Sequence, residues 1–146
     1  MLNEYEVSVP HQIIEYSANL DELLDISALV DALHLCAEGQ EELPIGGLRT
    51  RAYASRDYLI ADRHPDNAFI AVFLRVGEGR REEVLERVGK TLFDSLCETV
   101  QDRLDDQPIV LSYEIQIIDP RLRWNKNNLR EAMATRPGAS QVEGER

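Results

Sequence analysis

The sequence predicts an α/β (α+β) fold in which two β-α-β units form a four-stranded sheet with two helices on one face. Three observations support this prediction. Four short segments have the apolar pattern of strands, two longer segments repeat apolar residues at helical spacing, and the order strand, helix, strand occurs twice. Because a helix separates the two strands of each unit, those strands are expected to be parallel with a right-handed crossover.

The first unit follows a proline. Its expected elements are a strand at about 11–17, a helix from Asp25 to Glu38 and a second strand over residues 48–54. Pro10 suits the start of the first strand, because proline has no N–H to donate inside a sheet. The helix carries apolar residues at three- and four-residue intervals. Asp25 can cap its start, and Gly39 can end it.

The second unit repeats this order without evident sequence identity. Its expected elements are a strand over residues 68–76, a helix over 81–104 and a strand over 110–118. The first of these strands is apolar on both faces and is expected at the centre of the sheet, whereas the last alternates apolar and polar residues. With both helices on one face, the other face would be bare, so we expect it to pack on another subunit of a homo-oligomer.

These elements divide the chain into three parts. Residues 1–9 carry no periodic pattern and are expected to be an N-terminal extension, and residues 10–130 are expected to form one domain. Residues 131–146 are expected to be a disordered tail, because they are largely polar and contain proline and glycine. A chain of 146 residues is long enough to bury a core as a single domain.

The composition excludes several classes of function. A formal net charge of -11 argues against nucleic acid and anionic membranes as partners, since both attract a basic surface. No apolar run is long enough for a transmembrane helix, and the first residues lack the basic and apolar regions of a signal peptide. Cys36 and Cys97 fall at apolar helix positions and are expected to be buried free thiols. Together these observations predict a cytoplasmic protein.

No cofactor or metal site is expected from the motifs. His11, His34 and His64 fall on a strand, a helix and a loop, without the spacing of metal ligands. The sequence has no nucleophile motif, and Gly77-Glu78-Gly79-Arg80 lacks the lysine and the spacing of a phosphate loop. That stretch is interpreted as a tight turn into a helix.

Two arginines stand where an anion could bind. Arg49 opens a strand after two glycines, and Arg80 stands at the start of the second helix. A cation is disfavoured at a helix N-terminus unless an anion joins it, so Arg80 and the helix end could together hold a carboxylate. Surface salt bridges are the alternative interpretation for both arginines.

Five motifs occur in one order along the chain. They are P-H-Q-I-I-E-Y-S-A-N at 10–19, G-G-L-R-T-R at 46–51, A-F-I-A-V-F-L-R-V-G-E-G-R at 68–80, L-S-Y-E-I at 111–115 and W-N-K-N-N at 124–128. In order and spacing they resemble the 5-carboxymethyl-2-hydroxymuconate delta-isomerase family of the tautomerase superfamily. The resemblance extends from Pro10 to about Leu129, which is nearly all of the chain expected to be ordered.

The resemblance implies a tautomerase-like homotrimer that uses no cofactor or metal. Its implied substrate is 5-carboxymethyl-2-hydroxymuconate, or a similar ring-cleavage diene acid with three carboxylates, from homoprotocatechuate (4-hydroxyphenylacetate) catabolism. The family's N-terminal proline, which shuttles the proton, matches Pro10, and its arginines match Arg49 and Arg80. These arginines would hold carboxylates and stabilise the dienolate. The loop from Asp57 to Asn67 and the segment around Trp124 are expected to be pocket walls.

Pro10 departs from the family pattern because Val9 precedes it. A proline inside a chain is a tertiary amide and cannot act as a base, whereas a terminal proline is a secondary amine. One explanation is a mis-assigned start, because GTG encodes valine and also starts bacterial translation. A start at Val9 would leave Pro10 at the N-terminus after methionine removal. If Pro10 stays internal, the alternative is a non-catalytic oligomeric protein that binds an anionic metabolite.

Overall fold

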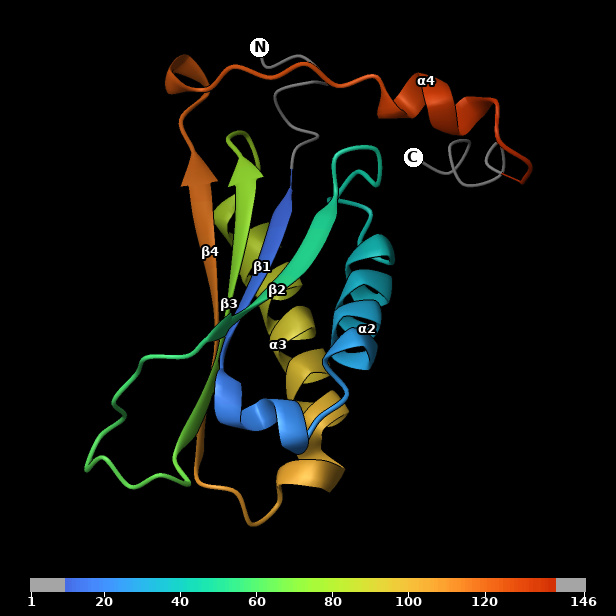
Figure 1. Ribbon diagram of the computed structural model, residues 1–146. Coiled ribbons are helices and arrows are strands. Elements are labelled where there is room, and N and C mark those ends of the chain that lie inside the picture. Colours follow the sequence, from blue (N-terminus) through green and yellow to red (C-terminus); the bar gives the residue numbers. More distant parts are fainter. Residues whose placement is uncertain (1–9, 139–146) are drawn as a thin grey trace.

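Four strands form one mixed sheet in the order β2-β1-β3-β4 (Figure 1). Their bounds are β1 His11–Ser17, β2 Arg49–Ser55, β3 Ala68–Gly77 and β4 Ile109–Ile118. β1 pairs with β2 and β3 pairs with β4 in parallel, and the two units join through the antiparallel pair of β1 and β3. The predicted pair of β-α-β units in a four-stranded sheet is therefore confirmed.

The structure is a computed structural model that describes residues 10–138. The expected N-terminal extension, residues 1–9, and residues 139–146 of the expected tail lie outside the described residues. Each expected strand and long helix is present, with bounds that differ from the expected ones by at most one residue at either end.

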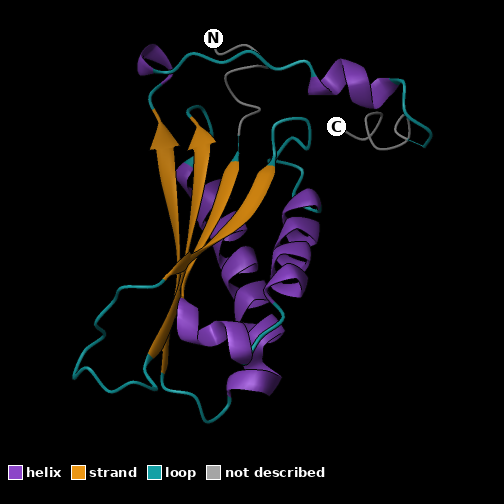
Figure 2. Ribbon diagram, viewed as in Figure 1, coloured by secondary structure: helices purple, strands orange, loops and turns teal. Residues whose placement is uncertain are grey.

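Both long helices, α2 (Ile26–Glu38) and α3 (Glu82–Leu104), cover the same face of the sheet (Figure 2). Asp25 caps α2 as expected, since its carboxylate accepts a hydrogen bond from the backbone N–H of Ala28 at 3.1 Å. Apolar side chains of the two central strands pack against the helices and form the core. Fully buried members of this core include Ile14, Leu29, Leu33, Ile70, Leu74, Leu92 and Leu96.

Three short helices were not predicted from the sequence. They are η1 (Ala18–Glu22), η2 (Pro120–Leu122) and α4 (Leu129–Ala134). The disorder expected from residue 131 is wrong for residues 131–134, which belong to α4. Long-range contacts hold this segment, because the Asn127 side-chain amide donates to the Gly46 carbonyl at 2.9 Å and the Arg130 side chain lies beside Gly46. Composition alone does not reveal such contacts.

A buried amide links four elements on the helix side of the sheet. Gln12 of β1 is fully buried, and its Nε2 donates to the Leu33 carbonyl of α2 and to the Thr50 hydroxyl of β2, each at 3.1 Å. Its Oε1 accepts from the Tyr113 hydroxyl of β4 at 2.8 Å. Three polar partners satisfy the amide, so its burial positions β1 instead of destabilising the core.

The face of the sheet without helices has a basic end. Side chains of β1 alternate, so that Gln12 and Ile14 are buried under the helices while His11 and Ile13 lie on the open face. From the Pro10 end, the rows across the open face are Arg49–His11–Arg75–Gln116, Arg51–Ile13–Phe73–Glu114 and Tyr53–Glu15–Ala71–Ser112. The first row is basic, and the rows beyond it are more apolar and acidic.

The connection over residues 56–67 lies at the other end of the sheet from Pro10 (Figure 1). It follows Ser55, which pairs with Ser17 at the far end of β1. Because a strand rises about 3.3 Å per residue, the length of β1 separates this loop from Pro10 by roughly 20 Å. The loop from Asp57 to Asn67 therefore cannot line a site around Pro10 of the same chain, which corrects that expectation.

The structure also answers two further expectations, on the cysteines and on membrane-spanning helices. Cys36 and Cys97 are free thiols as expected, although both are partly exposed and not buried. Within residues 10–138, no helix combines the length and the apolar content that a bilayer crossing requires.

Replacing Gln12 should destabilise the fold far more than replacing an exposed glutamine of the same sheet. The Gln12→Ala substitution should lower the free energy of unfolding by about 2–4 kcal/mol, because it opens a cavity and leaves buried polar groups without partners. Gln116→Ala, on the exposed side of β4, should change it by less than about 0.5 kcal/mol. Urea denaturation measures both values, and equal costs would contradict the structural role of Gln12.

Candidate active site

Pro10 lies at the end of the sheet where β1 begins. It is buried and directly precedes β1, and its carbonyl accepts a hydrogen bond from the backbone N–H of Arg49 at 3.2 Å. Since β1 runs antiparallel to β3, its start lies beside the end of β3, where Arg75 is located. Two strands therefore bring arginines to the surroundings of Pro10.

Arg49 is the sequence-predicted residue that the structure places next to Pro10. Its guanidinium is half-buried, and its Nε donates to the Gly47 carbonyl at 3.0 Å. Burial lowers the pKa of Arg49, and the charges of Arg123 and Arg51 lower it further. Because the pKa of an arginine remains far above neutrality in proteins, the shift reflects burial and the crowding of positive charge, and not deprotonation.

His11 lies among the positively charged arginines at this end of the sheet. Arg51 donates a hydrogen bond from Nη1 to His11 Nδ1 at 3.3 Å, and a second from Nε to the Tyr53 hydroxyl at 3.1 Å. A guanidinium has no acceptor, so Nδ1 of His11 must accept and its ring must be neutral in this arrangement. The pKa of His11 is lowered to about 4, chiefly by burial and further by the charges of four arginines.

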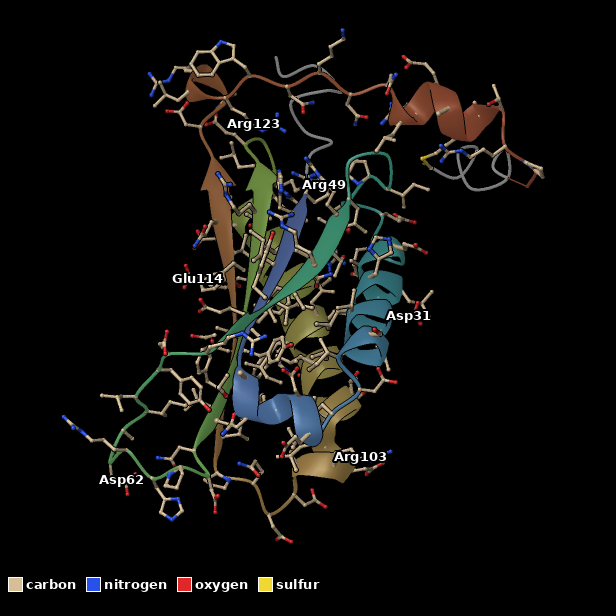
Figure 3. The ribbon with its side chains drawn as sticks, viewed as in Figure 1. Asp31, Arg49, Asp62, Arg103, Glu114 and Arg123 are labelled. Atoms are coloured by element: carbon tan, nitrogen blue, oxygen red, sulfur yellow. The ribbon has the colours of Figure 1, made fainter. Side chains whose placement is uncertain are left out.

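Those four arginines and His11 are called the basic cluster below; its members are His11, Arg49, Arg51, Arg75 and Arg123. Figure 3 shows Arg49 and Arg123 at the same end of the molecule, where the sheet begins at Pro10. In the part of the chain that the structure describes, none of these arginines forms an ion pair with a carboxylate. Guanidinium groups without a carboxylate partner leave this cluster with donors that match the geometry of an anion.

Only part of the basic cluster was predicted from the sequence. The sequence assigned a role to Arg49 but none to Arg51, which the register of β2 with β1 places on the same open face two residues later. Arg75 joins through the register of β3 with β1, and Arg123 through the path of the chain after β4. Neither position follows from local spacing, so no sequence signal identified these two arginines.

Arg80 stands apart from the basic cluster. It precedes the N-cap of α3, Arg81, and is half-buried. Its Nε donates to the Glu42 carbonyl at 2.9 Å, and its Nη1 donates to the Gly77 carbonyl at 3.1 Å. Arg80 thus ties the end of β3 to the loop before β2, at the same end of the sheet as Pro10. The charges that shift the pKa values of His11 and Arg49 do not include Arg80.

The segment after β4 crosses the Pro10 end of the sheet (Figure 1). Trp124 of this segment is 86% exposed, so within one chain it covers nothing. Its neighbour Arg123 is half-buried instead and lies close enough to Arg75 for the two charges to interact. The expectation of a pocket wall around Trp124 stays a prediction; within this segment Arg123 is the residue that belongs to the basic cluster.

A metal centre does not suit this arrangement. Among the described residues, no group of three or more His, Cys, Asp or Glu side chains gathers as metal ligands do. The charges that act on His11, the residue after Pro10, all come from arginines, and these would repel a metal cation. Guanidinium groups instead match the planar geometry of carboxylates. The site can therefore bind a carboxylate-bearing anion beside Pro10.

Comparisons with known proteins agree with this geometry. The model of the 5-carboxymethyl-2-hydroxymuconate isomerase family matches residues 10–133, so the match begins at Pro10. A curated relative from Escherichia coli, 5-carboxymethyl-2-hydroxymuconate Delta-isomerase, is 27% identical over 121 residues, which make up 83% of this chain and 96% of the relative.

Solved structures extend the comparison to three dimensions. A 5-carboxymethyl-2-hydroxymuconate isomerase from Deinococcus radiodurans R1 is 34% identical with a TM-score of 0.80, covering 92% of this chain and 100% of that chain. A fused 4-OT wild-type symmetric trimer is 16% identical with a TM-score of 0.58, covering 81% and 92% of the two chains, and shares the fold alone. The family resemblance and the tautomerase-like fold that the sequence predicted are confirmed.

His11 should titrate far below an ordinary histidine. The imidazole signal in an NMR titration should have its midpoint at about pH 4, compared with 6.5 for an unperturbed ring. The unfolded chain then binds more protons between these two values, so this group lowers the free energy of unfolding as pH falls from 6.5 towards 4. Above pH 6.5 its contribution should stay constant.

The substitution Arg51→Gln tests the part of this pKa shift that comes from the neighbouring arginine charges. Because it removes one positive charge beside the His11 ring, it should raise the midpoint of the His11 titration. Arg103→Gln is the matched control, because it removes the same charge at the opposite end of the molecule (Figure 3) and should leave the midpoint unchanged. A wild-type midpoint near 6.5 would contradict the arrangement of the basic cluster.

Proposed function

Because this chain belongs to the 5-carboxymethyl-2-hydroxymuconate isomerase family, we propose that it isomerises 5-carboxymethyl-2-hydroxymuconate or a similar ring-cleavage diene acid. The reaction moves a proton from the 2-hydroxyl of a dienol to a carbon further along the conjugated system. This transfer needs one group that accepts and returns the proton, and cations that stabilise the dienolate. The reaction belongs to homoprotocatechuate (4-hydroxyphenylacetate) catabolism.

The observation that carries this proposal is the basic cluster beside Pro10 in an acidic chain. The formal net charge is -11, yet the arginines around His11 make no ion pair within the described residues. Local guanidinium groups attract a polycarboxylate at short range, where the screened charge of the remaining surface acts weakly. The cluster therefore suits an anionic substrate with several carboxylates.

Pro10 is the proposed proton carrier. As an N-terminal residue it would be a secondary amine, and an ordinary α-amino group titrates at about 7.7–8.0. Burial and nearby guanidinium charges both disfavour a protonated amine and would lower its pKa below that range. The neutral amine would accept the hydroxyl proton and return it to carbon. Arg49 and Arg80 would meanwhile hold carboxylates of the substrate.

This role requires a free amine at Pro10, whereas the sequence places Val9 before it. The family match begins at Pro10, as a working chain with Pro10 at its N-terminus would require. If the Val9–Pro10 peptide is retained, the same basic cluster supports a second function. The protein would then be a non-catalytic oligomer that binds an anionic metabolite.

The proposed assembly is a homotrimer in the cytoplasm. The open face of the sheet carries partly exposed apolar side chains such as Ile13 and Phe73, which a neighbouring subunit would cover. The fused 4-OT protein that shares this fold is described as a symmetric trimer. Two free cysteines fit a reducing compartment.

A chain that begins at Pro10 should isomerise 2-hydroxymuconate-type acids, and the full chain that begins at Met1 should be slower by at least about a hundredfold. Only the first has a secondary amine at Pro10. The change in diene absorbance measures the rate, and kcat/KM should rise with pH through a pKa below about 8. Equal rates would show that another group is the base. Mass spectrometry of the protein from its native host identifies the working N-terminus.

Arg49→Ala and Arg80→Ala should each lower kcat/KM of the Pro10-start chain by about tenfold to a thousandfold, because each removes a carboxylate contact. The matched control is Arg81→Ala, whose exposed side chain pairs with Glu83 at 3.4 Å. Thermal melting distinguishes lost contacts from lost folding, which matters for Arg80 because it bonds two backbone carbonyls. A wild-type rate in either variant would remove that arginine from the mechanism.

A further inference from the structure

We infer that Arg75 and Arg123 form a further carboxylate subsite at the Pro10 end of the open face of the sheet, which binds the third carboxylate of the substrate. This inference rests on the proposed function and deepens it, since it assigns the third carboxylate of a tricarboxylate. Arg49 and Arg80 would hold the other two. The subsite would make the protein prefer tricarboxylates over dicarboxylates of similar length.

The position of the two arginines supports a shared ligand. Arg75 lies on β3 directly opposite His11, and its side chain is exposed on the open face. Arg123 comes from the segment after η2 and is half-buried. Figure 3 shows Arg123 at the end of the sheet where β1 begins, which is the end where Arg75 lies opposite His11. Burial lowers the pKa of Arg123, and the charge of Arg75 lowers it further; both arginines also help to lower the pKa of His11. Two guanidinium groups from distant parts of the chain therefore repel each other beside the Pro10 end.

Arg75 and Arg123 have no carboxylate to offset this repulsion in the part of the chain that the structure describes. The neighbouring Arg121 pairs with Asp119 at 3.1 Å and is thereby satisfied. Glu114 faces the open side two residues from Gln116, the partner of Arg75, but it accepts from Gln116 Nε2 at 3.0 Å and makes no ion pair with Arg75. An external anion would offset the repulsion and gain charge-assisted hydrogen bonds.

His11 separates this subsite from Arg51. The nitrogen Nδ1 of the neutral ring is occupied by Arg51, which also contacts Tyr53. Arg51 is therefore held by neutral partners, whereas among residues 10–138 the side chains of Arg75 and Arg123 donate no hydrogen bond. A neutral ring between the cations also avoids a further positive charge in the cluster. A carboxylate suits this subsite, because each of the two planar guanidinium groups can donate hydrogen bonds to the carboxylate oxygens.

Calorimetric titration of the full chain with two unreactive acids tests the subsite. Glutarate is the dicarboxylate and tricarballylate the saturated tricarboxylate, both at fixed ionic strength. Wild-type protein should bind tricarballylate about tenfold more tightly than glutarate. Arg75→Gln and Arg123→Gln should each weaken tricarballylate binding about fivefold, and the double variant should lose the preference. Glutarate affinity should change less than about twofold throughout.

Arg103→Gln is the matched control, because it removes the same charge from α3 at the far end of the molecule (Figure 3). It should leave both affinities unchanged. A double variant with the same preference as this control, or wild-type protein without a preference, would overturn the subsite. A carboxylate of a second copy of this chain could occupy the same position, and sedimentation of the same variants tests this alternative. If the double variant changes the assembly while the ligand preference stays, these arginines bind a carboxylate of a second copy, and the inference is wrong.

This titration is independent of proton transfer. Loss of isomerase activity in the Pro10-start chain, together with a retained tricarballylate preference, would reject the proposed reaction and leave an anion site. If the Pro10-start chain is active but the protein shows no preference for tricarballylate over glutarate, the subsite is rejected and the proposed reaction stands.

Discussion

The antiparallel pairing of β1 with β3 is the constraint on which the rest of the structure depends. It joins two parallel units into one sheet and places the start of β1 beside the end of β3. Because β2 is parallel to β1, its first residue reaches the same end. Pro10, Arg49 and Arg75 meet for this reason, although they come from three separate segments. The candidate site follows from strand direction before any side-chain contact is considered.

Alternation along β1 separates structural and chemical roles within two consecutive residues. Gln12 points to the helices, where three polar partners satisfy its amide. His11 points to the open face, where guanidinium groups surround its ring. A shift of register by one residue would exchange these environments, placing an imidazole under the helices and an amide among the arginines. The buried amide therefore helps to fix the register that presents the basic cluster.

Much of the fold and part of the candidate site could be predicted from the sequence. Apolar periodicity located the strands and long helices, because residues that share a face recur every two or every three to four positions. Local motifs pointed to Pro10, Arg49 and Arg80. Arg75 and Arg123 escaped prediction, because cross-strand register and the path of the chain after β4 join residues that are distant in sequence.

The sequence by itself determined the two β-α-β units, the family, and the identity of Pro10 as the residue on which the proposed chemistry turns. Tertiary structure alone decided which charges surround Pro10, that the loop from Asp57 to Asn67 lies at the opposite end of the sheet, and that Arg80 bonds the Glu42 carbonyl. The physical reason is the range of the interactions. Periodicity is a local property of the chain, whereas strand pairing and charge clustering act between segments that only folding brings together.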